Sequence, residues 1–278
     1  MSAERLSEIL KRLNEQHNNG QQLTPEEYEQ QQCDWANSKS GNLNEYDGYN
    51  CDTCKNKGVV YILRDNPYTG RKEMVQRACK CSSIRATLRR AKESGLNNIL
   101  TDYTFDKYET PEQWQKVIKE KAQLFCKDDH ARWFYIGGQT GAGKTHICTA
   151  IAAYYIKRGL DCRYMLWRDD AVKLKSVVND FERYQQLIEP FKNVDVLYID
   201  DYLKVQDGAE PTTADINLAF ELLNYRLLDK NKITIISSEF TMARALELDE
   251  ATNGRIYQQA GEYKINIDRN INKNYRLR

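Results

Sequence analysis

A glycine-rich segment in the middle of the chain has the composition of a phosphate-binding loop. Residues 137–145 read GGQTGAGKT and contain the pattern GxxxxGKT. Glycines allow backbone N–H groups to surround phosphates, and a helix starting at the lysine would direct its positive end toward them. Lys144 is then expected to reach the terminal phosphates, and the Thr145 hydroxyl to bind Mg²⁺. The residues expected to hold a nucleotide are Gly138, Thr140, Gly141, Ala142, Gly143, Lys144, Thr145 and His146.

A second motif supplies the carboxylates that such a loop requires. Residues 194–201 read VDVLYIDD, an apolar strand that ends in two acids. Asp200 is expected to orient the Mg²⁺ shell, and Asp201 to polarise an attacking water molecule. Asp201 is one methylene shorter than the glutamate common at this place. For His146, directly after the loop, local packing is the alternative to a catalytic role. Together the two motifs predict a nucleoside triphosphatase.

Four of the eight cysteines form two close pairs, a pattern that indicates metal ligands. Cys51 and Cys54 precede a β-rich run, and Cys79 and Cys81 follow a second one. A turn-forming segment, NPYTG, joins the runs and predicts a hairpin. A hairpin brings its ends together, so four thiolates could bind one structural Zn²⁺. Cys33 could replace one of them, and reduced cysteines without metal are the alternative.

The elements around the nucleotide motifs alternate between strand and helix. Apolar runs predict strands at 133–136, 162–167, 194–201, 233–238 and 263–267, and helical spacing predicts helices at 144–157, 170–188 and 215–228. Five strands with helical crossovers indicate a parallel five-stranded sheet flanked by helices.

The N-terminal third predicts a separate domain, residues 1–95, before a core at 96–278. It would contain helices within 1–45, the cysteine module at 50–82 and a basic helix at 82–95, with Arg85 on its surface. Leu6, Ile9, Leu10 and Leu13 form one apolar stripe, which packs within the domain or docks on a partner. Thr24 and Pro25 are expected to start a second helix.

Composition limits the class of protein. The chain has 278 residues with 41% hydrophobic side chains, enough for one large or two modest domains. Its net charge of +1 neither supports nor excludes a polyanionic partner. No apolar run is long enough to span a membrane and no secretory signal is evident, so a cytoplasmic location and no membrane partner are expected.

The order of these features resembles the DnaC/DnaI-type bacterial and phage helicase loaders of the AAA+ class. The resemblance covers roughly residues 50–278 and rests on these segments: the cysteine module, the basic helix ending in SGL, TDYTF at 101–105, GGQTGAGKTH, LYIDD, SSE at 237–239, NGRIY at 253–257 and NYR at 274–276. It implies a small helical and zinc-ribbon-like N-terminal domain before a P-loop AAA+ core. It also implies ATP as the nucleotide, with Mg²⁺ and Zn²⁺ as the metals.

By this resemblance the protein would bind the replicative helicase hexamer and help place it on single-stranded DNA, with weak ATP hydrolysis that depends on a partner or oligomer. Arg255 matches the position of an arginine finger acting on a neighbour in a ring or spiral; a surface salt bridge is the alternative. The sensor position, usually Asn, has Glu239 here, beside Ser238. The role of Arg276 stays open.

The candidate DNA contacts are basic residues, with an inserted helix expected within 168–184: Arg85, Arg89, Arg90, Arg168, Lys173, Lys175, Lys273, Arg276 and Arg278. Two other functions remain open. One is a transposition-helper ATPase of the IstB type, which acts on a transposase and duplex DNA but generally lacks a cysteine module. The other is an adaptor that binds ATP as a switch and hardly hydrolyses it.

Overall fold

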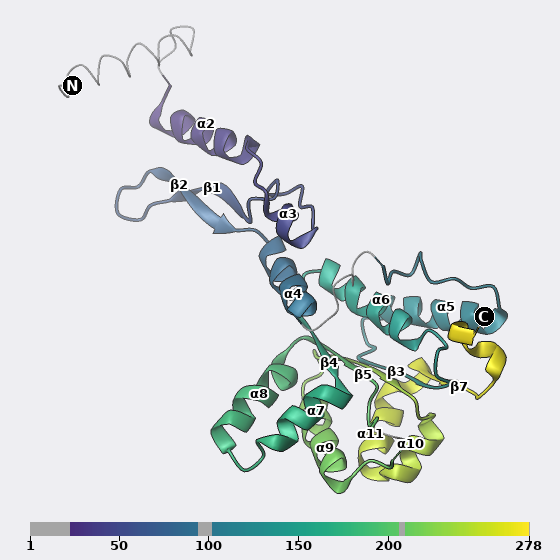
Figure 1. Cartoon of the computed structure of the whole chain (residues 1–278). Coiled ribbons are helices and arrows are strands. Elements are labelled where there is room, and N and C mark those ends of the chain that lie inside the picture. The colour runs from purple at the N-terminus through teal and green to yellow at the C-terminus, as the bar shows by residue number, and fades with distance from the viewer. Residues whose placement is uncertain (1–22, 94–101, 206–208, 278) are drawn as a thin grey trace. The chain divides into compact units, whose positions relative to one another are not determined.

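The computed structural model describes residues 23–93, 102–205 and 209–277 of the chain (Figure 1). The chain divides into two compact units, Met1–Ser82 and Ser83–Arg278. The division falls inside a helix, upstream of the boundary at 95 drawn from sequence. The apolar stripe from Leu6 to Leu13 and the start of TDYTF at Thr101 lie outside the described residues.

The first unit consists of two helices and a hairpin. Helix α2 (Pro25–Ser38) begins as expected, because Thr24 and Glu27 form a reciprocal capping box and Pro25 occupies the first turn. A short helix, α3 (Leu43–Asp47), follows. The predicted hairpin is confirmed: β1 (Val59–Asp65) pairs antiparallel with β2 (Lys72–Ala78).

Helix α4 (Cys81–Glu93) confirms the predicted basic helix but corrects one of its exposed residues. Arg85 was expected on the surface and is only 7% exposed. Near the start of this helix, the Ser83 hydroxyl donates to the Gly159 carbonyl at 3.3 Å. Arg85 lies two residues further along α4. Arg85 is therefore withdrawn as a DNA contact, whereas Arg89 is exposed.

The second unit is built on the five-stranded parallel sheet that the sequence predicts. Its strands are β3 (Trp133–Gly138), β4 (Cys162–Leu166), β5 (Val196–Asp200), β6 (Ile233–Ser238) and β7 (Lys264–Ile267). They lie in the order β4-β5-β6-β3-β7. The central strands β3, β5 and β6 are buried along their whole length, as expected for a parallel sheet covered on both faces.

Helices cover both faces of this sheet (Figure 1). On one side are α5 (Gln113–Lys127) and α6 (Lys144–Lys157). On the other are α7 (Trp167–Ser176), α8 (Phe181–Asn193), α9 (Thr213–Leu227), α10 (Met242–Leu248) and α11 (Glu250–Ala260). Short 3-10 turns η2 (Gly261–Tyr263), η3 (Ile271–Lys273) and η4 (Tyr275–Leu277) complete the described chain.

One predicted helix is wrong in its extent. The single helix expected at 170–188 is two helices, α7 and α8, and the first begins at Trp167. The Asp180 side chain accepts the Arg183 backbone N–H at 3.1 Å and so starts α8 anew. Apolar spacing continues across the break because both helices pack on the same core, which explains why periodicity did not reveal it.

Candidate nucleotide site and metal centre

The phosphate-binding loop connects buried strand β3 to helix α6. Gly138 and Gly143 have left-handed φ values of 111° and 81°, which favour glycine. A Cβ atom at Gly138 would also clash with the Ile267 carbonyl of β7. Helix α6 begins at Lys144, so its first N–H groups face the loop. The loop therefore has the geometry of a backbone cradle for phosphate.

Lys144 is folded back into this cradle. Its Nζ donates to the carbonyls of Gly138 at 2.9 Å and Gln139 at 2.8 Å. Burial lowers the pKa of Lys144, although Glu239, Asp201 and Asp200 act in the opposite direction. A phosphate oxygen is a stronger acceptor for an ammonium group than a carbonyl. Lys144 can therefore exchange its two backbone carbonyl acceptors for the phosphate oxygens of a bound nucleotide.

Asp200 is the last residue of β5, and its carboxylate accepts hydrogen bonds from three hydroxyl groups. The hydroxyls of Thr145, Tyr164 and Ser237 donate to its carboxylate, from Thr145 at 3.3 Å and from Tyr164 at 3.0 Å. Asp200 is 5% exposed. A buried carboxylate beside a threonine hydroxyl is an oxygen donor set that fits Mg²⁺. Thr145 and Asp200 are the residues that would hold it.

Asp201 points elsewhere, because its φ of 54° turns the chain sharply after β5. Its carboxylate contacts Lys204 Nζ at 3.1 Å, and the same Nζ contacts Glu239 at 2.8 Å. The Thr140 hydroxyl donates to Glu239 at 3.1 Å. At the sensor position Glu239 lies at the pocket, whereas buried Ser238 donates to the Tyr202 carbonyl. Lys204 was not singled out by the sequence analysis.

These side chains surround a cavity of about 560 Å³. That volume lies in the range of small-molecule sites, roughly 300–1,000 Å³. Of the eight residues expected to bind nucleotide, six form part of its lining, and Gly138 and Ala142 do not. The full lining is Tyr103, Lys107, Tyr108, Glu109, Thr140, Gly141, Gly143, Lys144, Thr145, His146, Asp200, Asp201, Lys204, Glu239 and Tyr275.

Aromatic side chains that the motifs did not reveal form one wall. The His146 ring lies between Tyr103 and Tyr108, with ring centroids 5.1 and 5.2 Å away. One ring nitrogen of His146 hydrogen bonds the Thr104 carbonyl at 2.9 Å, and burial lowers the pKa of His146. His146 therefore both packs locally and lines the pocket. The sequence analysis assigned TDYTF at 101–105 no role at the nucleotide site, so only the fold reveals that Tyr103 of this segment lines the pocket.

The C-terminal segment lies against the loop. Tyr275 N–H donates to the Gly141 carbonyl at 2.9 Å, and Asn270 N–H donates to the Gln139 side chain at 3.1 Å. The Tyr275 hydroxyl donates to the Glu109 carbonyl at 3.2 Å. These contacts place a tyrosine at the pocket rim. The side chain of Arg276 lies outside the described residues.

Arg255 lies on α11 and is not part of the pocket lining of its own chain. Its guanidinium stacks on the Phe220 ring, with 5.0 Å from the guanidinium carbon to the ring centroid. Within the described ranges it forms no ion pair, and its buried Nη1 lacks a hydrogen-bond partner. The surface salt bridge considered from sequence is therefore not present in the described part of the chain.

The candidate DNA contacts differ in their surroundings. Arg168 is exposed, and Lys173 pairs with Asp170 at 3.1 Å. Lys175 is neutralised by the buried carboxylate of Asp215. Lys273 lies 5.8 Å from the Trp114 ring centroid. The side chain of Arg90 and residue Arg278 lie outside the described residues.

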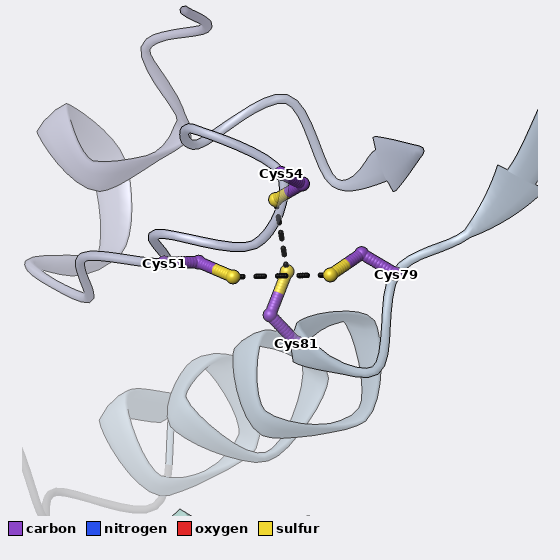
Figure 2. Close-up of side chains that lie close together, drawn as sticks. All are labelled: Cys51, Cys54, Cys79 and Cys81. Carbon is purple, nitrogen blue, oxygen red and sulfur yellow. Dashed lines mark hydrogen bonds between the residues drawn. The ribbon is translucent and has the colours of Figure 1, made fainter. Parts of the chain in front are cut away.

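In the first unit, the predicted convergence of four cysteines is confirmed (Figure 2). The sulfur atoms of Cys51, Cys54, Cys79 and Cys81 all lie within 4.8 Å of one another. The Cys51–Cys79 and Cys54–Cys81 sulfur distances are 3.8 and 3.5 Å. Four sulfurs at ~2.3 Å from one Zn²⁺ are separated by about 3.8 Å, so the donor set fits tetrahedral zinc.

The surroundings favour ionised sulfur at Cys54, whereas burial raises the pKa of Cys79. Burial opposes ionisation of Cys54, but the Gly58 N–H, at 3.3 Å from its sulfur, and the neighbouring thiols lower its pKa to about 7. Zinc binds the thiolate form. Cys33 does not belong to this cluster, because its thiol donates to the Tyr61 carbonyl at 3.0 Å. The alternative that Cys33 replaces a ligand is therefore not supported.

Comparison with known proteins places this chain in a family. The family described as "IstB-like ATP binding protein" matches residues 70–249, and the chain belongs to it. The phage-like element PBSX protein XkdC of Bacillus subtilis (strain 168) is 29% identical over 230 residues, 79% of this chain and 82% of that protein.

Two further matches involve helicase loaders. The replicative helicase loader DnaC of Buchnera aphidicola subsp. Baizongia pistaciae is 28% identical over 148 residues, which cover half of this chain and 58% of that protein. A crystal structure of the DnaC helicase loader superimposes with a TM-score of 0.50 at 18% identity, over 62% of this chain and 98% of that one. The resemblance to helicase loaders and the AAA+ P-loop fold is thereby confirmed. In the described part of the chain, no helix is long and apolar enough to cross a membrane.

Proposed function

We propose that this protein is an ATP-dependent loader that binds a replicative DNA helicase and helps place it on single-stranded DNA. The central observation is the pocket in which Lys144, Thr145, Asp200 and Asp201 meet. The similarity to a DnaC loader supports the helicase as partner. The site supports ATP as the substrate, and the family description names ATP.

Each residue of the pocket has its own role in ATP hydrolysis. Lys144 and the loop N–H groups bind the β and γ phosphates, and Thr145 with Asp200 would hold Mg²⁺, which neutralises developing charge when bound. Asp201 accepts a hydrogen bond from the attacking water and orients it. Because Arg255 lies outside its own chain's pocket, it acts on a neighbouring chain in a ring or spiral, so turnover is weak in the isolated protein.

The N-terminal unit serves partner binding in this proposal. Zinc at the four cysteines holds the hairpin end and the start of α4 together, in a module too small to build a large apolar core. The protein would act in the cytoplasm.

The experiment that tests the function is native mass measurement of this protein mixed with the replicative helicase of its host, with ATP, with ADP and without nucleotide. A defined complex whose stoichiometry changes with nucleotide is the expected result. Absence of a complex in all three conditions, with ATP and DNA binding retained, contradicts the loader function.

The family match supports a second candidate, a transposition-helper ATPase, because the matched family is named for IstB-like proteins. The match begins at residue 70 and so excludes Cys51 and Cys54, which the loader proposal uses. Binding of a transposase and of duplex DNA, in place of helicase and single strands, would favour this candidate.

A further inference from the structure

Lys204 forms a bridge between two acids of the nucleotide pocket. Its Nζ lies 3.1 Å from the Asp201 carboxylate and 2.8 Å from the Glu239 carboxylate, and all three residues line the cavity. Glu239 in turn accepts the hydroxyl of Thr140 in the phosphate-binding loop. A lysine thus links the proposed water-orienting acid to the sensor position and, through it, to the loop.

The chain after β5 holds Lys204 firmly in this place. Asp201 and Leu203 both have left-handed φ values, 54° and 60°, which tighten the turn, and Lys204 N–H donates to the Asp201 carbonyl at 2.9 Å. Tyr202 and Leu203, between the two charged residues, are fully buried, and the Tyr202 N–H donates to the Ser237 carbonyl at 2.8 Å. The two buried residues anchor the turn, so the charged residues on either side face the pocket.

The charges of the pocket require such a cation. The acids in its lining are Glu109, Asp200, Asp201 and Glu239, and the lysines are Lys107, Lys144 and Lys204. Burial disfavours the charged form of Lys204, but Glu239 and Asp201 outweigh it and raise its pKa. Lys204 is therefore a cation at neutral pH. A terminal phosphate entering this pocket would meet Asp201 and Glu239, and repulsion would oppose it without Lys204.

We propose that Lys204 recognises the terminal phosphate of a bound nucleoside triphosphate and, by exchanging its carboxylate partners for that phosphate, releases Asp201 to orient water. The inference rests on the proposed ATPase function and names a specificity-determining residue within it. A diphosphate lacks the group that competes for Lys204, so Asp201 stays paired with the lysine. The contact between Lys204 and the terminal phosphate thereby distinguishes a triphosphate from a diphosphate, and it frees Asp201 to orient water.

The test is calorimetric titration of the full-length protein with a non-hydrolysable ATP analogue and with ADP, both with Mg²⁺. In Lys204→Met, the affinity for the analogue falls about tenfold, because one charged hydrogen bond is lost, while the affinity for ADP changes less than about twofold. Lys204→Arg restores most of the preference. Lys232→Met is the matched control, since Lys232 pairs with Asp229 at the same sequence spacing, at 3.3 Å, but outside the pocket.

The outcomes separate this inference from the function on which it rests. An unchanged preference in Lys204→Met, or an equal loss of both nucleotides, overturns the role of Lys204 and leaves ATP binding by the wild type intact. A wild-type protein that binds neither nucleotide overturns the proposed ATPase function itself.

Discussion

Asp200 and Asp201 are neighbours in the chain but lie in different surroundings. Asp200 is buried and accepts hydrogen bonds from three hydroxyl groups, whereas Asp201 lines the pocket and is half-buried beside Lys204. The first arrangement suits a fixed metal ligand. The second leaves a carboxylate that can change partners, as an acid that orients water must.

The substitution Asp201→Asn is expected to separate hydrolysis from binding. The asparagine keeps the shape but loses the basic oxygen, so turnover falls by about 10²–10⁴-fold while ATP affinity stays nearly unchanged. Lys144→Ala removes the phosphate contact itself, and ATP binding is lost. Turnover and equilibrium binding of labelled ATP measure the two effects.

Complex formation with the helicase then distinguishes a loader from an adaptor that uses ATP only as a switch. The adaptor predicts that Lys144→Ala abolishes the complex while Asp201→Asn leaves it intact. Equal loss in both variants contradicts the adaptor.

At the scale of elements, one side chain joins helix α9 to the start of two strands. Arg226 is fully buried, and its guanidinium donates to the Thr234 hydroxyl. It also donates to five backbone carbonyls, those of Phe191, Lys192, Val194, Asp195 and Ile233. These carbonyls lie at the end of α8, just before β5 and at the first residue of β6.

Arg226→Met is expected to lower the free energy of unfolding by about 3–5 kcal/mol, because the buried carbonyls lose their donors. The midpoint of urea unfolding measures it. Arg244→Met is the control: Arg244 pairs with Glu210 and Glu247 at the surface, so its loss costs less than about 1 kcal/mol. A similar small effect in both variants would contradict the role of Arg226.

The hairpin module depends on its metal in a different way. We expect one zinc per chain, and we expect its removal by chelator, or Cys54→Ser, to unfold the first unit, because zinc binding supplies much of the folding free energy of such modules. Hydrogen exchange of the β1 and β2 amides measures this. Cys33→Ser, outside the cluster, should retain zinc. Well under one zinc per chain in protein prepared without chelator would exclude the site.

At the scale of the whole molecule, Arg255 predicts that hydrolysis needs more than one chain. Arg255→Ala is expected to lower turnover by about 10³–10⁵-fold with ATP binding retained. Mixing it with Lys144→Ala should restore part of the turnover, since one variant supplies the intact pocket and the other the arginine. Turnover that stays at the sum of the two separate variants contradicts action between chains.

Local patterns in the sequence determined the strands, the phosphate-binding loop and the cysteine hairpin. Apolar runs, the GxxxxGKT spacing and a turn between two cysteine pairs each act over a few residues, so they can be interpreted without knowing the fold. The break between α7 and α8 was missed because periodicity reports which face is buried, not where the helix stops.

The tertiary structure alone decided which distant residues meet. Lys204 and Glu239 follow different strands, and they contact each other only because β5 and β6 lie side by side in the sheet. Tyr275 reaches the pocket because the chain after β7, the neighbour of β3, returns to the phosphate-binding loop. Arg85 has a charged side chain, from which exposure was expected, yet it is buried in the folded protein. Such contacts depend on strand order and on packing between elements, which no local pattern encodes.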